Sequence, residues 1–214
     1  MKRFDIITEA DARVLPIGAT VELDPGGHVT PLARDTLRER RVTVVRAGAD
    51  PDLASLAPVS PVTRLAIASD HTGVAMKAAL ARDLRARGLA VDDLGVERAD
   101  VKADYPDMAA LVARAVARGE ADAGIVIDGS GIGSAMAANK VRGVRAATCH
   151  DETTARCARA HNCANVLALG STILPDADAA RRVVEAWLDT PMREPRYIRR
   201  LSKIREIEDQ EARR

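Results

Sequence analysis

The sequence predicts an α/β protein, a three-layer α/β/α sandwich whose middle layer is a five-stranded parallel, Rossmann-like sheet. From residue 64 onwards, short apolar segments rich in β-branched residues alternate with longer segments of helical pattern. A glycine-rich segment joins the third of these strands to the next helix. Aromatic residues make up only 2% of the chain, so Ala, Val, Leu and Ile must fill the core. Strands and helices that alternate in this way form βαβ units with right-handed crossovers, which makes the sheet parallel.

The periodicity of the apolar residues places each element of this domain. We expect strands at residues 64–68, 89–94, 123–127, 144–148 and 166–169, and helices at 73–87, 106–118, 132–140, 152–161 and 176–189. A further helix is expected between Met192 and Arg214, because Tyr197, Leu201 and Ile204 recur at helical spacing. The basic side chains of this helix lie on another face. This face is either a solvated surface or a site that binds a substrate phosphate in a neighbouring subunit.

Residues 1–47 are expected to form a small accessory α+β module, followed by a linker at 48–63 and the main domain at 64–214. In the module, a short helix begins near Thr8, and a strand at 20–23 ends in a turn at 24–27. Thr30 and Pro31 then supply the cap and first residue of a helix that reaches Arg40, and a strand follows at 42–45. The prolines of the linker, with small and polar residues between them, are typical of such a segment.

The overall composition excludes several classes of protein. The net charge of +1 gives no reason to expect nucleic acid or an anionic membrane as a partner. The apolar runs are too short to span a membrane, and the early acidic residues Asp5, Glu9 and Asp11 interrupt any signal peptide, so we expect a cytoplasmic protein. The three cysteines are expected to be reduced thiols. Cys157 and His161 lie four residues apart, but no CxxC or HExxH pattern accompanies them, and no metal is expected.

The most informative segment runs from Ala123 to Lys140. A buried apolar strand leads to a single carboxylate, Asp128, and then to a loop with glycine at 129, 131 and 133. Glycines let the backbone approach a ligand closely, and amides in such a turn can hold a phosphate or a developing oxyanion. Asp128 would lie at the carboxyl end of its strand, where open α/β sheets bind their ligands. We therefore predict a phosphosugar site in which Asp128 transfers a proton.

Two other pairs of polar residues lie at the ends of predicted elements. Asp70 and His71 follow the first strand of the main domain, where a carboxylate and an imidazole can share the handling of protons. Asp70 could equally serve as a helix cap. His161 and Asn162 end the helix before the last strand, where the histidine could also be a simple complement to the helix dipole.

Several ordered motifs resemble one family of enzymes. They are Asp70-His71-x-Gly73, Asp104-Tyr105-Pro106, Gly129-Ser-Gly-x-Gly133 followed by Ala-Ala-Asn139-Lys140, Gly143-Val-Arg145-Ala, and His161-Asn162-x-x-Asn165-Val-Leu-Ala-x-Gly170. Over about residues 64–210 the chain is similar to the B-type ribose-5-phosphate isomerases and the galactose-6-phosphate isomerase subunits. The segment from Val29 to Arg40 has a shorter resemblance to an accessory region of ethanolamine-utilisation cobalamin adenosyltransferases, which are linked to bacterial microcompartments.

The resemblance implies interconversion of an aldose phosphate and a ketose phosphate through a cis-enediolate, without metal or cofactor. It implies that Asp70 and His161 assist ring opening and transfer hydroxyl protons. Threonine is common in the family at the position of Ser130, and serine retains its hydroxyl group. The glycine loop would hold the oxygen that gains charge. Substrate binding would fall to the residues His71, Tyr105, Gly129, Gly131, Ile132, Gly133, Asn162, Arg145, Arg196 and Arg200, with Arg199 and Lys203 aligning less closely. A homodimer, or a dimer of dimers, would form the site at its subunit interface.

The chain departs from the family at Asp128. Many members carry a cysteine there as the base, and others use a glutamate at the position of Ser134. A carboxylate can serve if burial raises its pKa toward neutrality; the alternative is that Asp128 only anchors a sugar hydroxyl. Ribose 5-phosphate is the default substrate, with four- or six-carbon aldose phosphates as alternatives. A non-catalytic sugar-phosphate binder and, from the glycine spacing, a nucleotide-binding oxidoreductase are the rival functions.

Overall fold

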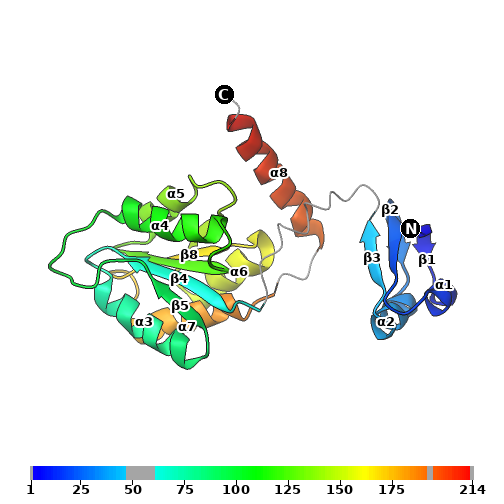
Figure 1. Ribbon diagram of the computed structural model, residues 1–214, viewed down its shortest axis with the longest axis horizontal. Helices are drawn as coiled ribbons and strands as arrows, with labels where there is room; N and C mark the ends of the chain where they lie inside the picture. The colour runs from blue at the N-terminus through cyan, green and yellow to red at the C-terminus, as the bar shows by residue number, and fades with distance from the viewer. Residues whose placement is uncertain (1, 47–60, 192–194, 213–214) are drawn as a thin grey trace. The chain divides into compact units, whose positions relative to one another are not determined.

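The computed structural model describes residues 2–46, 61–191 and 195–212 (Figure 1). The chain divides into two compact units, Met1–Ala54 and Ser55–Arg214. Most of the predicted linker, residues 48–60, lies outside the described residues.

The first unit is a three-stranded parallel sheet with two helices. Its elements, in chain order, are β1 (Lys2–Ile7), α1 (Glu9–Val14), β2 (Thr20–Val29), α2 (Pro31–Glu39) and β3 (Thr43–Arg46), and the strand order is β1-β2-β3. Both predicted helix starts are confirmed: Thr8 forms a capping box with Asp11, and the Thr30 side chain accepts a hydrogen bond from the Ala33 amide. The strand β1 was not predicted, because its charged residues hide the apolar pattern.

The predicted end of β2 is wrong. The segment from Asp24 to Gly27 lies inside the strand, which continues to Val29. Phe4 pairs with Leu23 and Ile6 with His28, so the turn-forming residues are accommodated as an irregularity in the ladder. An insertion of this kind bends a strand without ending it.

The second unit confirms the predicted sandwich, with a five-stranded parallel sheet in the order β5-β4-β6-β8-β7. The elements are β4 (Arg64–Ser69), α3 (Val74–Ala86), β5 (Ala90–Asp93), α4 (Tyr105–Ala117), β6 (Ala123–Asp128), α5 (Ile132–Ala138), β7 (Ala146–Thr148), α6 (Glu152–Asn162), β8 (Val166–Gly170), α7 (Ala177–Leu188) and α8 (Pro195–Glu211). All six residues of β6, the central strand, are buried.

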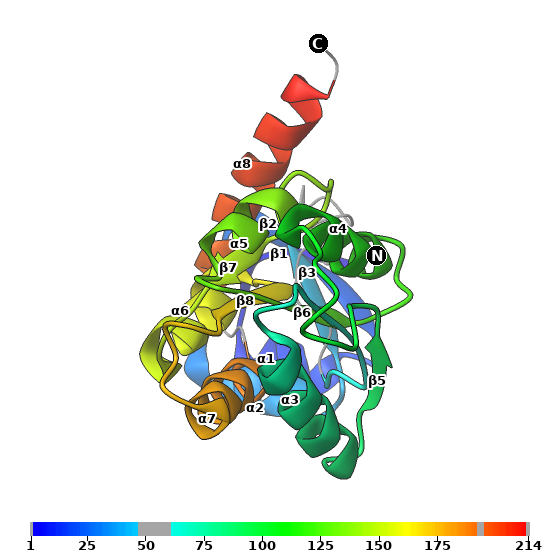
Figure 2. The same ribbon diagram turned by 90° about the vertical axis from the view of Figure 1, so that its left-hand side faces the viewer.

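Two apolar clusters hold the layers together. Ile125 and Ile127 of β6 pack in the cluster that includes α3, α6 and α7, while Val126 packs in the cluster formed with α4 and α5. Figure 2 shows these two groups of helices on opposite faces of the sheet. The alternation follows from the period of two in a strand, and it fixes which residues of β6 can face each helix layer.

The apolar residues that pack helix α8 on the rest of this unit lie in its first half. Tyr197 and Leu201 are buried, whereas Ile204 and Ile207 are 51% and 61% exposed. Further along α8, the Glu208 carboxylate accepts a hydrogen bond of 3.0 Å from the Gly143 amide, and Asp209 pairs with Arg142. The predicted apolar stripe is therefore real, but part of it is not covered by this unit.

The turn from β6 into α5 depends on Gly131. Its φ of +78° lies in the left-handed region, and a Cβ built on it would lie 2.9 Å from the carbonyl carbon of Leu169 and 3.1 Å from Cγ2 of Thr148. Both the backbone conformation and the close approach to β8 therefore require glycine.

Substitution of Gly131 should separate these two requirements. Gly119 has a similar φ of +69° with no atom within 4 Å of its Cβ position. We expect Gly119→Ala to cost about 1 kcal/mol of unfolding free energy from backbone strain alone. Gly131→Ala should cost roughly 1–3 kcal/mol more, because its Cβ meets backbone. Equal costs in urea denaturation would contradict the contact with β8.

The amino end of the sheet is held by Asp122. One carboxylate oxygen accepts hydrogen bonds from the amides of Thr63, at 3.0 Å, and Arg64, at 2.9 Å, and the other pairs with the Arg64 guanidinium at 2.7 Å. Burial alone would raise the pKa of Asp122, but these donors and the Thr63 hydroxyl lower it to about 2. The carboxylate thus ties the start of β4 to the start of β6.

This depressed pKa makes a prediction about stability and pH. Because the folded pKa lies below the unfolded value of 3.8, the stabilisation is complete above pH 3.8 and is lost as the pH falls toward 2. We expect Asp122→Asn to lower the unfolding free energy at pH 7 by about 2 kcal/mol. The unfolding free energies of the two proteins, measured by urea denaturation, should converge as the pH falls to about 2. A difference that stays constant between pH 7 and pH 2 would contradict this prediction.

Candidate active site

Three strands of the second unit end side by side at one edge of the sheet. Ser69 pairs with Ile127 and Asp128 pairs with Gly170, so the loops after β4, β6 and β8 emerge together. Hydrogen bonds join these loops; they run from the Ser171 amide to the Asp128 carbonyl (2.8 Å), from the Thr172 amide to the Gly129 carbonyl (2.9 Å), and between the Ser171 and Thr72 hydroxyls (3.2 Å). This carboxyl edge carries the first group of predicted site residues.

Asp128 is buried and bound to its own loop. One carboxylate oxygen accepts hydrogen bonds from the amides of Ser130, at 2.7 Å, and Gly131, and the other accepts from the amide of Ser134 at 2.9 Å. Both oxygens are therefore engaged by backbone N–H groups of the turn and of α5. The Ser130 and Gly131 amides, which were expected to hold a charged substrate oxygen, already have an acceptor.

The expected rise in the pKa of Asp128 is wrong. Burial does raise the pKa, but the hydrogen bonds at this carboxylate outweigh burial, and the pKa lies below its ordinary value. Besides the three amides, the buried Ser134 hydroxyl lies close enough to lower the pKa, although it is not in hydrogen-bonding geometry. A carboxylate that is stabilised as the anion is a weaker base. The tight turn that glycine permits is what brings these donors onto Asp128.

The rest of the glycine loop is only partly hydrogen-bonded among the described residues. The Ser130 hydroxyl accepts a hydrogen bond of 3.2 Å from the Ile132 amide, and the Ile132 side chain is 51% exposed. A Cβ on Gly133 would lie 2.6 Å from the ring of Tyr105, so the first residue of α4 lies directly against the loop, as the prediction for Tyr105 requires. The Gly133 amide makes no hydrogen bond to the described residues.

Asp70 and His71 lie at the same edge. Asp70 is buried, and its Oδ1 accepts hydrogen bonds from the amide of Thr72, at 2.8 Å, and from the Thr72 hydroxyl, at 2.6 Å. Within the described part of the chain, its Oδ2 makes no hydrogen bond. Nδ1 of His71 is buried and likewise has no partner among these residues. The carboxylate is thus oriented by one oxygen while the other remains available.

The second group of predicted residues lies at the opposite edge of the sheet. Arg145 immediately precedes β7, whose first residue, Ala146, pairs with Val166 at the start of β8. Val166 in turn pairs with Gly124, four residues before Asp128. At about 3.3 Å per residue, Asp128 therefore lies about 13 Å along the strands from the residues that pair beside Arg145. Within one chain, the structure does not bring the two groups together.

The side chains of this second group gather where α6 ends and α8 begins. The rings of His161 and Tyr197 stack with centroids 4.7 Å apart, and the Arg200 guanidinium lies 5.6 Å from the Tyr197 ring centroid. Asn162 is exposed and donates a 3.4 Å hydrogen bond to the Cys157 carbonyl. Arg196 belongs to the first turn of α8, but its side chain lies outside the described part.

Two arginines, the buried Arg159 and the part-buried Arg145, fix the turn that follows His161. Nε of Arg145 donates to the Cys163 carbonyl at 3.1 Å, and Arg159 donates to the Ala164 carbonyl at 2.8 Å. Burial lowers the pKa of both, that of Arg159 to about 10. The sequence analysis missed Arg159, although its spacing of four residues from Ala155 places it on the buried face of α6. Cys163 itself has a φ of +48°, so these bonds hold a conformation that a non-glycine residue seldom adopts.

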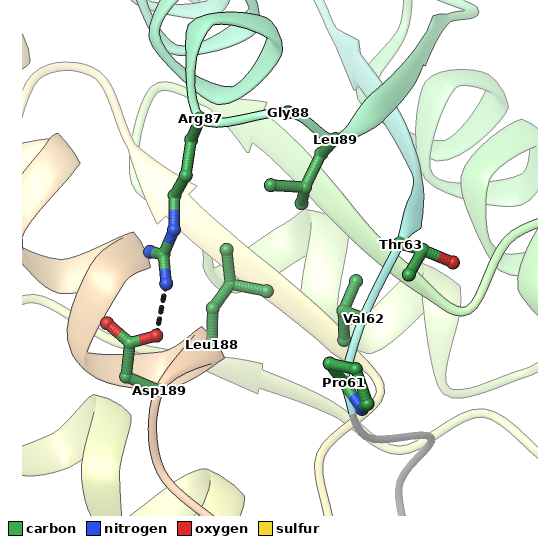
Figure 3. A pocket seen from close by; sticks show the side chains of 8 residues that line it. All are labelled: Pro61, Val62, Thr63, Arg87, Gly88, Leu89, Leu188 and Asp189. Atoms are coloured by element: carbon green, nitrogen blue, oxygen red, sulfur yellow. Dashed lines mark hydrogen bonds and ion pairs between the residues drawn. The ribbon is translucent and has the colours of Figure 1, made fainter.

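A cavity of about 360 Å³ lies at the ends of α3 and α7, lined by Pro61, Val62, Thr63, Arg87, Gly88, Leu89, Leu188 and Asp189 (Figure 3). Its two charged side chains pair with each other, and none of the predicted residues lines it. Within the described ranges, no three His, Cys, Asp or Glu side chains could hold a metal ion, the three cysteines are free thiols, and no helix could cross a membrane.

Comparison with known proteins adds the family. Residues 65–204 match the model of the ribose/galactose isomerase family. The chain is 39% identical to ribose-5-phosphate isomerase B of Escherichia coli over 145 residues, which cover 68% of this chain and 96% of that enzyme. It is 35% identical to D-erythrulose-4-phosphate isomerase of Pectobacterium atrosepticum over 147 residues, covering 69% and 96%.

A solved structure agrees with these matches. Ribose-5-phosphate isomerase B of Mycoplasma genitalium, with bound ribulose 5-phosphate, is similar with a TM-score of 0.65 and 40% identity, covering 69% of this chain and 97% of that one. The match begins at β4, so the unit formed by β1 to β3 lies outside it. From β4 to α8, the chain belongs to the ribose/galactose isomerase family of sugar-phosphate isomerases.

Proposed function

We propose that the chain interconverts an aldose phosphate and a ketose phosphate by proton transfer through a cis-enediolate, with no cofactor. The observation that carries the proposal is the grouping at one sheet edge of the buried Asp70, with its available Oδ2, and the glycine loop covered by Tyr105. A carboxylate that can accept a proton, next to a backbone turn that can hold a ligand, is suited to moving a proton on the carbon beside a sugar carbonyl. A protein that only binds sugar phosphates would not need the carboxylate.

Ribose 5-phosphate and ribulose 5-phosphate are the proposed substrates by default. The relatives support a phosphorylated sugar, but one is named for a five-carbon and another for a four-carbon compound. Six-carbon aldose phosphates remain the further alternative. In each case the phosphate would be bound by side chains that donate hydrogen bonds, for which His71, Arg145, Arg196 and Arg200 are the candidates, and Asn162 would contact a sugar hydroxyl.

A complete site is proposed to need two copies of the chain. Asp70 and the glycine loop lie about 13 Å along the strands from the level of Arg145, and His161 ends the helix at that far edge. A homodimer that sets the carboxyl edge of one copy against the α6–α8 region of the other would bring both groups to one ligand. The exposed Ile204 and Ile207 of α8, and Ile132 and Met136 of α5, supply apolar surface for such an interface. We place this dimer in the cytoplasm.

A panel of sugar phosphates should identify the substrate. Purified protein is incubated with four-, five- and six-carbon aldose phosphates, and ketose formation is followed by NMR. We expect one chain length to have the highest kcat/KM, with ribose 5-phosphate as the default, and no response to chelators. Binding without turnover of any member would favour the non-catalytic binder, and hydride transfer to added NAD would favour an oxidoreductase.

Mixing two inactive variants should reveal the shared site. Asp70→Ala and His161→Ala remove groups that would come from different copies. After the subunits are exchanged in mild denaturant and refolded, half of the dimers are hybrids, and each hybrid has one intact site. Activity should therefore return to about a quarter of the parental value. A mixture that stays inactive although mass spectrometry detects the hybrid would contradict the two-copy site.

A further inference from the structure

The hydrogen bonds of Asp128 leave the proton-transfer step without its expected base. Asp128 was expected to be that base, but three backbone amides donate hydrogen bonds to its two oxygens. Asp128 could take a proton from carbon only by losing its charge, which would weaken all three of these hydrogen bonds. The turn would then lose part of what holds it, because a hydrogen bond to a neutral carboxyl is weaker than one to a carboxylate.

We infer that Asp70 takes the carbon-bound proton in this enzyme, and that Asp128 is a positioning residue that holds the glycine loop in shape. The inference rests on the proposed isomerase function and names the group that performs its central step. It assigns Asp70 a role beyond ring opening and hydroxyl-proton handling.

The geometry of Asp70 suits this role. It follows β4 directly, next to Asp128 at the end of the neighbouring strand, and its amide donates to the Ile127 carbonyl at 3.1 Å. The two bonds from Thr72 hold Oδ1 and so orient the carboxylate, while Oδ2 has no hydrogen bond within the described residues. Only 6% of the residue is exposed, so a substrate that reaches Oδ2 would meet a base largely shielded from water.

The hydrogen bonds between the loops connect Asp70 to the remainder of the edge. The Thr72 hydroxyl that binds Asp70 also accepts a hydrogen bond from the Ser171 hydroxyl, and the Ser171 amide donates to the Asp128 carbonyl. The position of Asp70 relative to the glycine loop is therefore set through the loop that follows β8. Through this connection Asp128 could affect the reaction without accepting the proton. By holding the glycine loop, Asp128 would keep the bound substrate correctly positioned relative to Asp70.

The step can be written from the ketose side. The Asp70 carboxylate takes a proton from C1, the C1–H electron pair forms the C1–C2 double bond, and the carbonyl electrons move to O2. The resulting enediolate passes the hydroxyl proton from O1 to O2. The Asp70 carboxyl then returns its proton to C2, and O1 becomes the aldehyde oxygen. One carboxylate suffices for both carbon atoms, and no oxidant or reductant is needed.

An open-chain substrate separates this role from ring opening. Ribulose 5-phosphate and erythrulose 4-phosphate cannot close a furanose ring, because the oxygen that would close it carries the phosphate or is absent. Each ketose is incubated with the full-length protein in D2O, and deuterium at C1 is followed by NMR. We expect Asp70→Asn to reduce incorporation by roughly 10³-fold.

The Asp128 variants test the other half of the inference. Asp128→Asn removes the carboxylate, and Asp128→Ser keeps a hydroxyl oxygen that can accept a loop amide but cannot act as the base. At least one of them should keep more than about 1% of the parental incorporation, the scale of loss expected from misplacement alone. Asp122→Asn serves as control, since it removes a carboxylate bound by amides at the other edge of the sheet, and it should incorporate deuterium at the parental rate.

The outcomes are distinct. Retained incorporation in Asp70→Asn, or its loss in both Asp128 variants to the level of Asp70→Asn, would overturn the inference. Parental protein that incorporates no deuterium into either ketose would instead refute the proposed isomerase function, because the comparison of variants requires a parental rate.

Discussion

The amides of the glycine loop and the carboxylate of Asp128 satisfy one another, and the arrangement of the candidate site depends on this interaction. The loop closes because glycine at position 131 accepts a positive φ and lies against β8, and closure turns successive N–H groups onto the end of β6. A carboxylate so held is fixed in place and stabilised as an anion. The glycine spacing that predicts a ligand-binding turn therefore also lets the chain's own carboxylate bind loop amides that a ligand would otherwise use.

The parallel sheet imposes a second constraint. All strands of the second unit run in one direction, so residues that follow strands gather at one edge and residues that precede strands gather at the other. Asp70, His71 and the glycine loop belong to the first kind, while Arg145, His161 and Asn162 belong to the second. No local adjustment can bring side chains together across the length of the strands, which is why the proposed function needs a second copy of the chain.

Much of the fold could be predicted because local pattern and tertiary structure agree. All five strands of the main sheet and the helices between them lie within a few residues of the predicted ranges, since buried parallel strands and amphipathic helices leave clear periodicities. The failures have equally physical reasons. β1 is masked by Lys2, Arg3 and Asp5, and the segment from Asp24 to Gly27 has turn chemistry but lies within a strand because the ladder continues beyond it.

The sequence could nominate residues for the candidate site, but it could not predict their electrostatics. Sequence motifs brought Asp70, Tyr105, Asp128 and His161 to attention, but the pKa of Asp128 depends on where backbone amides point, and no side-chain pattern encodes this. Arg159 was not predicted, because the sequence does not distinguish a buried arginine from an exposed helical one unless its carbonyl acceptor is known. The sheet edges to which the residues belong could have been worked out from the order of strands and helices alone.

The stacking of Arg159 on Trp187 has a practical consequence. Trp187 is the sole tryptophan of the chain and is fully buried, with the Arg159 guanidinium 5.1 Å from its ring centroid. Both tyrosines also lie in the second unit, whereas the first unit holds the single phenylalanine, Phe4. Intrinsic fluorescence therefore monitors the isomerase unit alone, and melting of the small sheet would pass unseen by that probe.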